Sequence, residues 1–272
     1  MNLTLASIFK AVLQISLLAL TAGTAIAQDV VTLKVHHFLP PSSTAHAKFI
    51  VPWCDKIAKE SNNRMKCQIY PAMQLGGTPA QLFDQAKDGV ADIIWTVPGY
   101  QAGRFTVSEA FELPFIVTST EKGSRALWHY ATKNAMQEFK GVKPILFHLH
   151  DGNLLHTARK QIKSLEDFRG AKVRAATRQS TKMLTALEAT PVPMPLPQTP
   201  ESLAKGVIDG ALIPWEVSPA LKLEEIAQFH TELDPSSGQI SNSVFIFAMN
   251  PAKYNSLPPD LKKVIDANSG PE

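Results

Sequence analysis

A length of 272 residues, a hydrophobic content of 44% and a net charge of +3 describe a globular chain with enough apolar material for a core. Lysine and arginine are interspersed with aspartate and glutamate without a basic run, which disfavours nucleic acid as a partner. The two cysteines, Cys54 and Cys67, favour a disulfide in an oxidising compartment over two separate buried thiols, and their surroundings lack the ligand spacing of a metal site.

The first 27 residues have the order of a secretory signal peptide. Lys10 precedes an apolar run over 11–22, and the small residues 25–27 follow with the A-x-A pattern of a cleavage site. This run is too short for a spanning helix, and no later stretch approaches the roughly 18 apolar residues that such a helix needs. We therefore expect an exported, periplasmic protein whose mature chain begins near Gln28.

The first half of the mature chain alternates predicted strands and helices. A helix from Ser43 or Thr44 to Lys59 separates the first two strands, and a helix capped by Thr78, with Pro79 at its first position, leads to the third. This order indicates an α/β fold with parallel strand pairing. The predicted strands cover 30–39, 64–72 and 90–99.

A long amphipathic segment, 120–139, and a buried strand, 143–150, follow, and the alternation then starts again. The later predictions are a helical turn over 164–170, strands over 171–176 and 209–214, an extended segment over 190–196, helices over 180–189 and 199–206, and a late strand and helix over 244–250 and 257–266. If the late strand joins the first unit, the chain crosses between lobes at least twice. We expect lobe I over 29–150 and 240–272, and lobe II over 151–239.

The histidines are the first candidates for chemistry. The segment HLHDGNLLH contains His148, His150, Asp151 and His156, and His37 ends the first strand. Neither an H-E-x-x-H zinc motif, a G-x-S-x-G nucleophile elbow nor a phosphate-binding loop accompanies them. We expect hydrogen-bonded structural or cleft-lining histidines, no cofactor, no resident metal and no enzyme; an exported metal-dependent hydrolase is the alternative.

Two arginines, Arg174 and Arg178, flank a short run of small residues in GAKVRAATRQS. A planar guanidinium holds a carboxylate through two parallel hydrogen bonds, so an arginine that leaves a strand beside a cleft is suited to anchor an organic acid. A surface or interdomain ion pair is the competing interpretation for each.

Several segments together resemble one family. In order and spacing, AKFIVPWCDKIAKES, YPAMQLGG, DQAKDGVADIIW, FELPFI, SLEDFRGAKVRAATRQS and AKGVIDGALIP are similar to the extracytoplasmic solute-binding proteins of tripartite ATP-independent periplasmic (TRAP) transporters, the DctP-like family. The resemblance runs from about residue 33 to 266, and its most specific part is D-x-x-G-x-K-x-R over 167–174.

This resemblance implies a two-lobed periplasmic-binding-protein fold, type II-like, with a ligand cleft between the lobes and a hinge crossed at least twice. It implies that Arg174 pairs with the ligand carboxylate, and that the protein delivers its ligand to the membrane permease subunits of a TRAP transporter. Coupling to a sensor kinase instead of a permease remains open. Family members continue beyond the last residues of this sequence, so we expect a truncated or lost closing segment.

Departures from the family pattern bear on the ligand. Leu154 stands where sugar-acid binders carry a second arginine, and the segment 210–214 lacks their asparagine. Apolar residues leave sugar hydroxyls unpaired on burial, which costs about 1–3 kcal/mol each. We therefore expect a carboxylate with an apolar or aromatic body; sugar acids and keto acids are the alternatives. The residues expected around the cleft are Phe38, Trp95, Val97, Tyr100, Ile213 and Trp215, together with His37, His150 and Asp151.

The sequence leaves two roles open for each of two charged residues. Arg178 contacts a second carboxylate or a phenolic oxygen of the ligand, or it is simply solvated. Glu216 accepts a ligand hydroxyl, or it holds a cation that bridges to the ligand as in some keto-acid binders of the family. Trp95 also has the alternative of being core packing.

Overall fold

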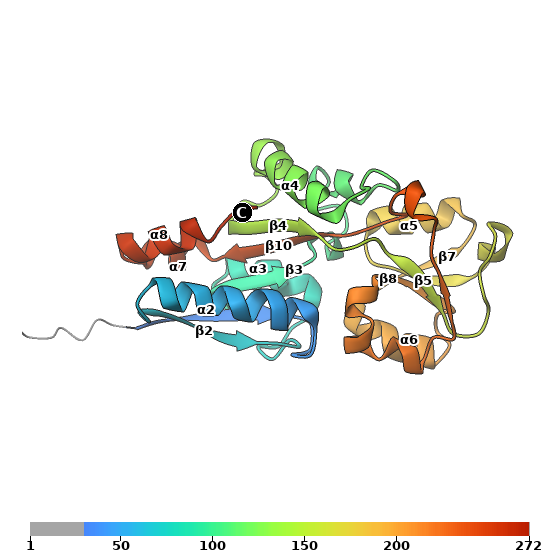
Figure 1. Cartoon of the computed structure of the whole chain (residues 1–272), viewed down its shortest axis with the longest axis horizontal. Helices are drawn as coiled ribbons and strands as arrows, with labels where there is room; N and C mark the ends of the chain where they lie inside the picture. The colour runs from blue at the N-terminus through green and yellow to red at the C-terminus, as the bar shows by residue number, and fades with distance from the viewer. Residues whose placement is uncertain (1–29, 272) are drawn as a thin grey trace, which may run out of the picture. The chain divides into compact units, whose positions relative to one another are not determined.

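Two five-stranded sheets organise the chain. In a computed structural model, residues 30–271 are described, and the expected signal peptide lies outside these residues. The first sheet has the strand order β2-β1-β3-β10-β4 and the second β7-β6-β8-β5-β9 (Figure 1). The strands are β1 (Val31–His37), β2 (Met65–Tyr70), β3 (Ile93–Thr96), β4 (Lys143–Leu149), β5 (Leu154–Thr157), β6 (Lys172–Ala175), β7 (Thr190–Pro193), β8 (Gly210–Ile213), β9 (Phe229–Thr231) and β10 (Val244–Met249).

Capping residues set the start of several helices. Thr78 and Gln81 form a capping box before α3, and Thr177 and Ser180 form one at the start of α5. Ser119 and Asn250 cap α4 and α7 with their side chains. The helices are α2 (Val51–Glu60), α3 (Leu82–Lys87), α4 (Thr120–Tyr130), α5 (Arg178–Ala186), α6 (Thr199–Ala204), α7 (Pro251–Ser256) and α8 (Pro259–Ala267).

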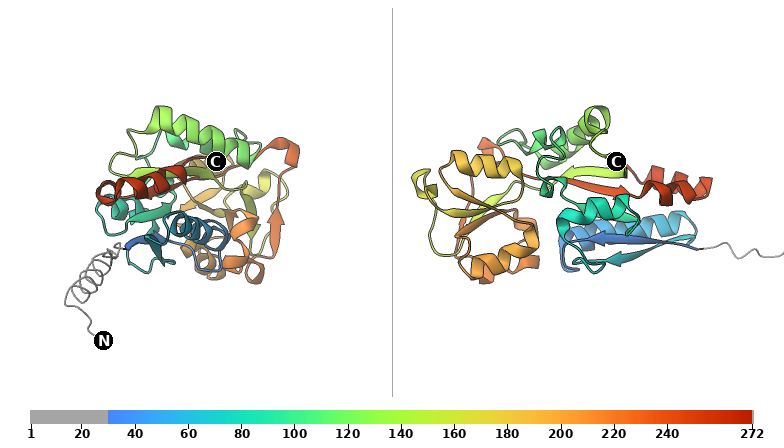
Figure 2. Two further views of the ribbon diagram at one scale, coloured as in Figure 1. Left: turned by 60° about the vertical axis from the view of Figure 1, so that its left-hand side comes forward. Right: turned by 180° about the vertical axis from the view of Figure 1, so that it is seen from behind.

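The same parallel unit occurs in both sheets. β1 pairs in parallel with β2 and β3, and β6 pairs in parallel with β7 and β8. Because right-handed crossovers lead first to one side of the central strand and then to the other, the two connecting helices cover opposite faces. Figure 2 shows α5 and α6 on opposite sides of the second sheet in this way. The α/β fold with parallel pairing is therefore confirmed.

Antiparallel strands carry the chain between the sheets. β10 lies between β3 and β4 and is antiparallel to both, and β5 lies likewise between β8 and β9. The chain passes to the second sheet through 150–153 and returns through 232–243. These crossing segments are joined, because Asn153 donates from its backbone nitrogen to the Ser241 carbonyl at 2.9 Å and from Nδ2 to Ser241 Oγ at 3.0 Å.

A disulfide and an apolar core stabilise the first sheet and its helices. Cys54 on α2 is bonded to Cys67 on β2, so the disulfide favoured by the sequence is confirmed. All six residues of β10 are buried, because this strand has neighbours on both edges and helices over its sheet. Within residues 30–271, the helices are too short or too polar to traverse a bilayer.

Candidate ligand-binding site

Arg174 is a buried cation on the central parallel strand of the second sheet. Only 4% of the residue is exposed, and β6 holds it between Val192 on β7 and Ala211 on β8. Its Nε donates to the carbonyl of Met194 and its Nη1 to the carbonyl of Leu212, each at 3.1 Å. These two bonds fix the plane of the guanidinium.

No acidic side chain among residues 30–271 forms an ion pair with Arg174. Burial lowers the pKa of its guanidinium, and the neighbouring Tyr100 acts in the opposite direction. A buried charge without a counter-ion is costly, and an anion that replaces water beside it recovers much of that cost. The remaining donors of Arg174 are therefore suited to receive a carboxylate.

Arg174 lines a cavity to which both sheets contribute, with an empty volume of about 390 Å³. Its polar lining groups besides Arg174 are few, and aromatic and aliphatic side chains predominate, which is the usual composition of a small-molecule site. The lining residues are Phe38, Leu39, Trp95, Val97, Tyr100, His150, Asn153, Arg174, Ala176, Leu196, Pro214, Glu216, Val217, Ser243 and Phe245.

Trp95 forms one aromatic wall of this cavity. Its ring stacks on Phe38 at 5.2 Å between centroids and on Phe245 at 4.5 Å, with interplanar angles of 16° and 17°. Its Nε1 donates to His148 Nε2 at 2.9 Å, while His148 Nδ1 donates to the Leu149 carbonyl at 3.0 Å. Because these bonds and stacks hold the indole, the wall is set before a ligand enters.

A second cavity adjoins the first and has an empty volume of about 880 Å³. Trp95, His150, Glu216 and Phe245 line both cavities, so these four residues mark their junction. Thr44 reaches across from the first lobe, with its hydroxyl donating to the Glu216 carbonyl at 3.3 Å. The remaining residues of the second cavity are Thr44, Ala45, Lys48, Phe49, Thr120, Leu146, His148, Leu149 and Asp151.

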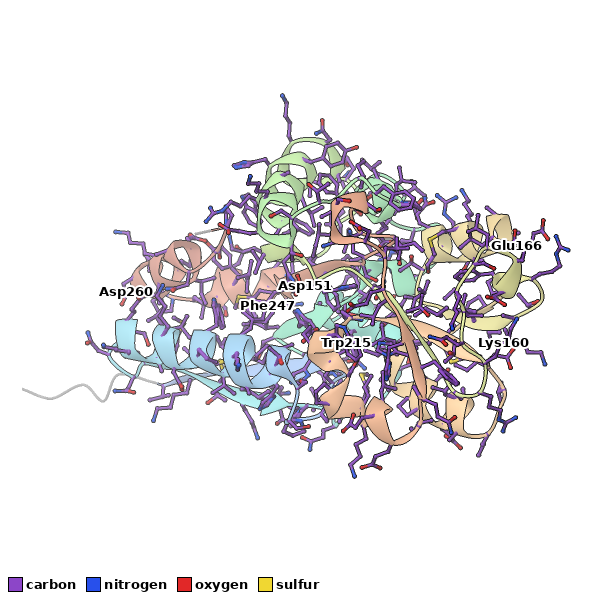
Figure 3. The ribbon with its side chains drawn as sticks, turned by 45° about the vertical axis from the view of Figure 1, so that its right-hand side comes forward. Asp151, Lys160, Glu166, Trp215, Phe247 and Asp260 are labelled. Carbon is purple, nitrogen blue, oxygen red and sulfur yellow. A yellow bond between two sulfur atoms is a disulfide. The ribbon has the colours of Figure 1, made fainter. Side chains whose placement is uncertain are left out.

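The ionisable groups at the junction are perturbed by their surroundings. Burial lowers the pKa of His150 to about 4, and the charge of Arg174 acts in the same direction. Desolvation raises the pKa of the Glu216 carboxyl, and the nearby Asp151 adds to this effect. Asp151 accepts a 2.7 Å hydrogen bond from Thr120 Oγ1 at the crossing between the sheets (Figure 3).

Six of the ten candidate residues from the sequence lie around these cavities. Phe38, Trp95, His150, Arg174 and Glu216 line the first cavity, and Asp151 lines the second. Val97 and Tyr100, expected near the cleft, also line the first cavity.

His37 and Ile213 lie outside both cavities. His37 is fully buried at the end of β1, where its Nε2 is 2.9 Å from His46 Nδ1. Burial lowers the pKa of His37 to about 3, so the ring is neutral at physiological pH. Ile213 ends β8 with no exposed surface and packs in the core.

Arg178 and Trp215 also lie elsewhere. Arg178 forms an ion pair with Glu109, and its Nε lies 3.2 Å from Glu109 Oε2. Trp215 follows β8 in the turn Trp215–Val217, is 47% exposed and donates from Nε1 to Glu232. In this conformation, the polar groups of both residues are bound to carboxylates of the protein.

Sequence reasoning missed several lining residues. Phe245 lies in an entirely apolar strand, so nothing in the pattern separates it from the core side chains beside it. Asn153 and Ser243 come from the crossing segments. These segments meet only because the chain passes to the second sheet before β5 and returns to the first sheet before β10. The other missed residues are Leu39, Ala176, Leu196, Pro214 and Val217.

The histidines of HLHDGNLLH are divided between the two sheets. His148 supports Trp95, whereas His156 on β5 pairs with His230 on β9 at 2.7 Å between their Nδ1 atoms. Within residues 30–271, no three histidine, cysteine, aspartate or glutamate side chains are grouped as metal ligands.

Residues 35–270 match the family model of the bacterial extracellular solute-binding proteins, family 7. The chain is 52% identical to a TRAP solute-binding protein from Rhodoferax ferrireducens, solved with copurified benzoate, over 89% of this chain and 75% of that one, with a TM-score of 0.88. It is 48% identical to a marine metagenome TRAP solute-binding protein described as specific for aromatic acid ligands and solved with 3-hydroxybenzoate, over 89% and 76%, with a TM-score of 0.87. A third similar structure, from Bordetella bronchiseptica with bound (R)- and (S)-mandelate, is 27% identical over 89% and 76%, with a TM-score of 0.83.

Proposed function

The chain belongs to the bacterial extracellular solute-binding proteins of family 7, and from this premise we propose that its ligand is an aromatic carboxylate anchored by Arg174. The similar structures with benzoate, 3-hydroxybenzoate and mandelate support this choice, since each of these ligands joins a carboxylate to a benzene ring.

The observation that carries the proposal is the buried guanidinium of Arg174 facing a cavity with an aromatic wall. Two carbonyls fix the guanidinium from the protein side, and no acidic side chain of the described residues neutralises it. A ligand carboxylate supplies the missing charge. The stacked Trp95, Phe38 and Phe245 then offer apolar surface to a ring, with the offset and edge geometries that aromatic pairs prefer.

The same cavity disfavours highly hydroxylated ligands. Leu39, Val97, Leu196 and Val217 line it without a hydrogen-bonding side chain. Each sugar hydroxyl that they leave unpaired costs about 1–3 kcal/mol. Sugar acids therefore bind more weakly than aromatic acids in this proposal.

Capture depends on two lobes that close around the ligand. We assign lobe I to 29–150 and 240–272, and lobe II to 151–239, with the crossing segments as the hinge. Closure removes water from the pair between Arg174 and the carboxylate, which strengthens the attraction. The protein then delivers the ligand from the periplasm to TRAP permease subunits and performs no catalysis of its own.

Replacement of Arg174 by alanine tests the anchor. We expect the affinity for benzoate, measured by isothermal titration calorimetry, to fall about 100-fold or more, because a buried charge partner is lost. Arg174→Lys should bind with intermediate affinity, since a lysine keeps the charge but not the planar fork.

Arg169→Ala is the matched control, because Arg169 lies shortly before β6 and pairs with the exposed Glu188. We expect it to bind benzoate as the unaltered protein does. If Arg174→Ala remains folded by circular dichroism and keeps the original dissociation constant, Arg174 is not the anchor.

A further inference from the structure

His150 lines the candidate site and uses one of its two ring nitrogens within the protein. Its Nδ1 is hydrogen-bonded to the backbone carbonyl of Asp151. A carbonyl oxygen only accepts, so Nδ1 carries the proton of this bond. The tautomer of a neutral His150 is thereby fixed, with an unprotonated Nε2.

The protonation state agrees with this tautomer. Burial lowers the pKa of His150 to about 4, and the positive charge of Arg174 disfavours a second cation nearby. At neutral pH the Nε2 atom is therefore an acceptor with a free lone pair. Among residues 30–271, no protein donor is bonded to this atom.

The imidazole of His150 lies beside the space that a ligand held at Arg174 would fill. The residue lines the first cavity together with Arg174 and also borders the second cavity. Phe245 contacts the imidazole edge-on, with 5.8 Å between the ring centroids and an angle of 77°. The position of the ring is thus set by an aromatic contact and a backbone hydrogen bond.

The other polar groups of the first cavity distinguish less sharply between a ligand group that donates a hydrogen bond and one that accepts it. The Asn153 amide is bonded to Ser241, and the hydroxyls of Tyr100 and Ser243 both donate and accept. Glu216 lines both cavities, and its carboxyl, whose pKa desolvation raises, donates when protonated and accepts when ionised. His150 Nε2 differs from them because the tautomer of the neutral ring leaves it only able to accept.

We propose that His150 accepts a hydrogen bond from a hydroxyl group on the ligand, so that the preferred ligands are hydroxylated aromatic carboxylates. This inference rests on the proposed function, because Arg174 must first orient the carboxylate. His150 then acts as a specificity-determining residue that distinguishes a ring bearing a hydroxyl donor from an unsubstituted ring.

The test compares benzoate with 3-hydroxybenzoate, 4-hydroxybenzoate and the corresponding methoxybenzoates by calorimetry. We expect at least one hydroxybenzoate to bind between about two- and tenfold more tightly than benzoate, as one net hydrogen bond provides. Its methyl ether should lose this advantage, because it has no proton to donate. Equal binding of hydroxy and methoxy isomers would overturn the proposal even without a protein variant.

His150→Phe and His150→Gln extend the test to the residue. The readout is the ratio of the benzoate and hydroxybenzoate dissociation constants, which separates the hydroxyl from any change in binding of the ring. We expect a ratio near one for His150→Phe and a partly restored ratio for His150→Gln, whose side-chain oxygen accepts. Arg169→Ala is the control, and it should keep the original ratio.

Two failures remain distinguishable. If neither benzoate nor any substituted benzoate binds, the proposed function fails, and this inference fails with it. If benzoate binds and no hydroxybenzoate binds better, or if His150→Phe keeps the original ratio, only the assignment of His150 is wrong. If His150→Phe does not fold, the hydroxy and methoxy comparison and His150→Gln decide.

Discussion

At the scale of single residues, the hydrogen bonds of His148 hold Trp95 in position in the cavity wall. His148 connects the Leu149 carbonyl to Trp95 Nε1, and burial lowers its pKa to about 4. The ring is therefore neutral at pH 7, and its Nε2 accepts the indole proton. Trp95 lines the first cavity, and His148 holds Trp95 in position from behind.

Replacement of His148 by phenylalanine tests this support. The new ring keeps the stacking surface toward Phe245 but leaves the indole proton of Trp95 without its acceptor, which costs about 1–3 kcal/mol. We expect the free energy of unfolding in urea to fall by this amount and benzoate to bind several-fold more weakly. His148→Gln, which keeps an acceptor, should lose less of both. Equal losses in the two variants would show that packing, and not the hydrogen bond, matters here.

At the scale of elements, local signals predicted the parallel units well. Thr78 and Pro79 mark the start of a helix, and apolar runs bounded by turn residues mark β1, β3 and β10. The four-residue β5 and the three-residue β9 were not predicted, because such short segments show no periodicity of their own. Their strand character comes from antiparallel pairing with distant partners.

The same division applies to the candidate site. Arg174 was identified only because its segment resembles a family, since a lone arginine in a strand is more often an ion pair. Phe38 and Trp95 were expected around the cleft among other apolar residues, and both line the first cavity. Phe245 and Ser243 could not be identified, because their position depends on the return of β10 to the first sheet.

The disulfide joins α2 to β2 away from both cavities of the candidate site. Cys54 and Cys67 are 13 residues apart and line neither cavity of the candidate site. A loop of this size contributes about 3 kcal/mol by restricting the unfolded chain. We expect the double variant Cys54→Ser, Cys67→Ser to lose about this much stability in urea denaturation while its benzoate affinity stays the same. A large change in affinity would show that this unit is coupled to the site.

At the scale of the whole described chain, the start of α5 links the two lobes beside the cavities. Glu109, from the turn Ser108–Glu112, accepts hydrogen bonds from Arg178 and from Gln179, the latter at 2.9 Å. Glu112 accepts from the backbone nitrogen of Val244 at 3.0 Å. The second lobe and the returning strand β10 therefore contact the same turn of the first lobe.

Glycine at position 99 permits part of this approach. A Cβ at Gly99 would lie 2.7 Å from Thr177 Cγ2 and 3.3 Å from Glu112 Oε1. The first distance is too short for a normal contact, so a side chain here would push the start of α5 away from the turn. The close approach also keeps water from the Glu112 carboxyl, which is 2% exposed.

This enclosure gives the protein a stability that depends on pH. Burial raises the pKa of Glu112 from 4.5 to about 7, against the opposing effects of the Val244 N–H and Thr177, and Glu109 adds to the rise. Because the folded pKa lies above the unfolded one, the unfolded chain binds fewer protons between these values, and stability falls as the pH rises from about 4.5 through about 7. Glu112→Gln mimics the protonated carboxyl, so its stability should lack this decline. We expect urea denaturation to show that the free energy of unfolding of Glu112→Gln, minus that of the unaltered protein, rises over this window by at most about 3 kcal/mol. A difference that stays constant over this window would mean that folding does not raise the pKa of Glu112, and that the contact between the lobes tolerates its charge.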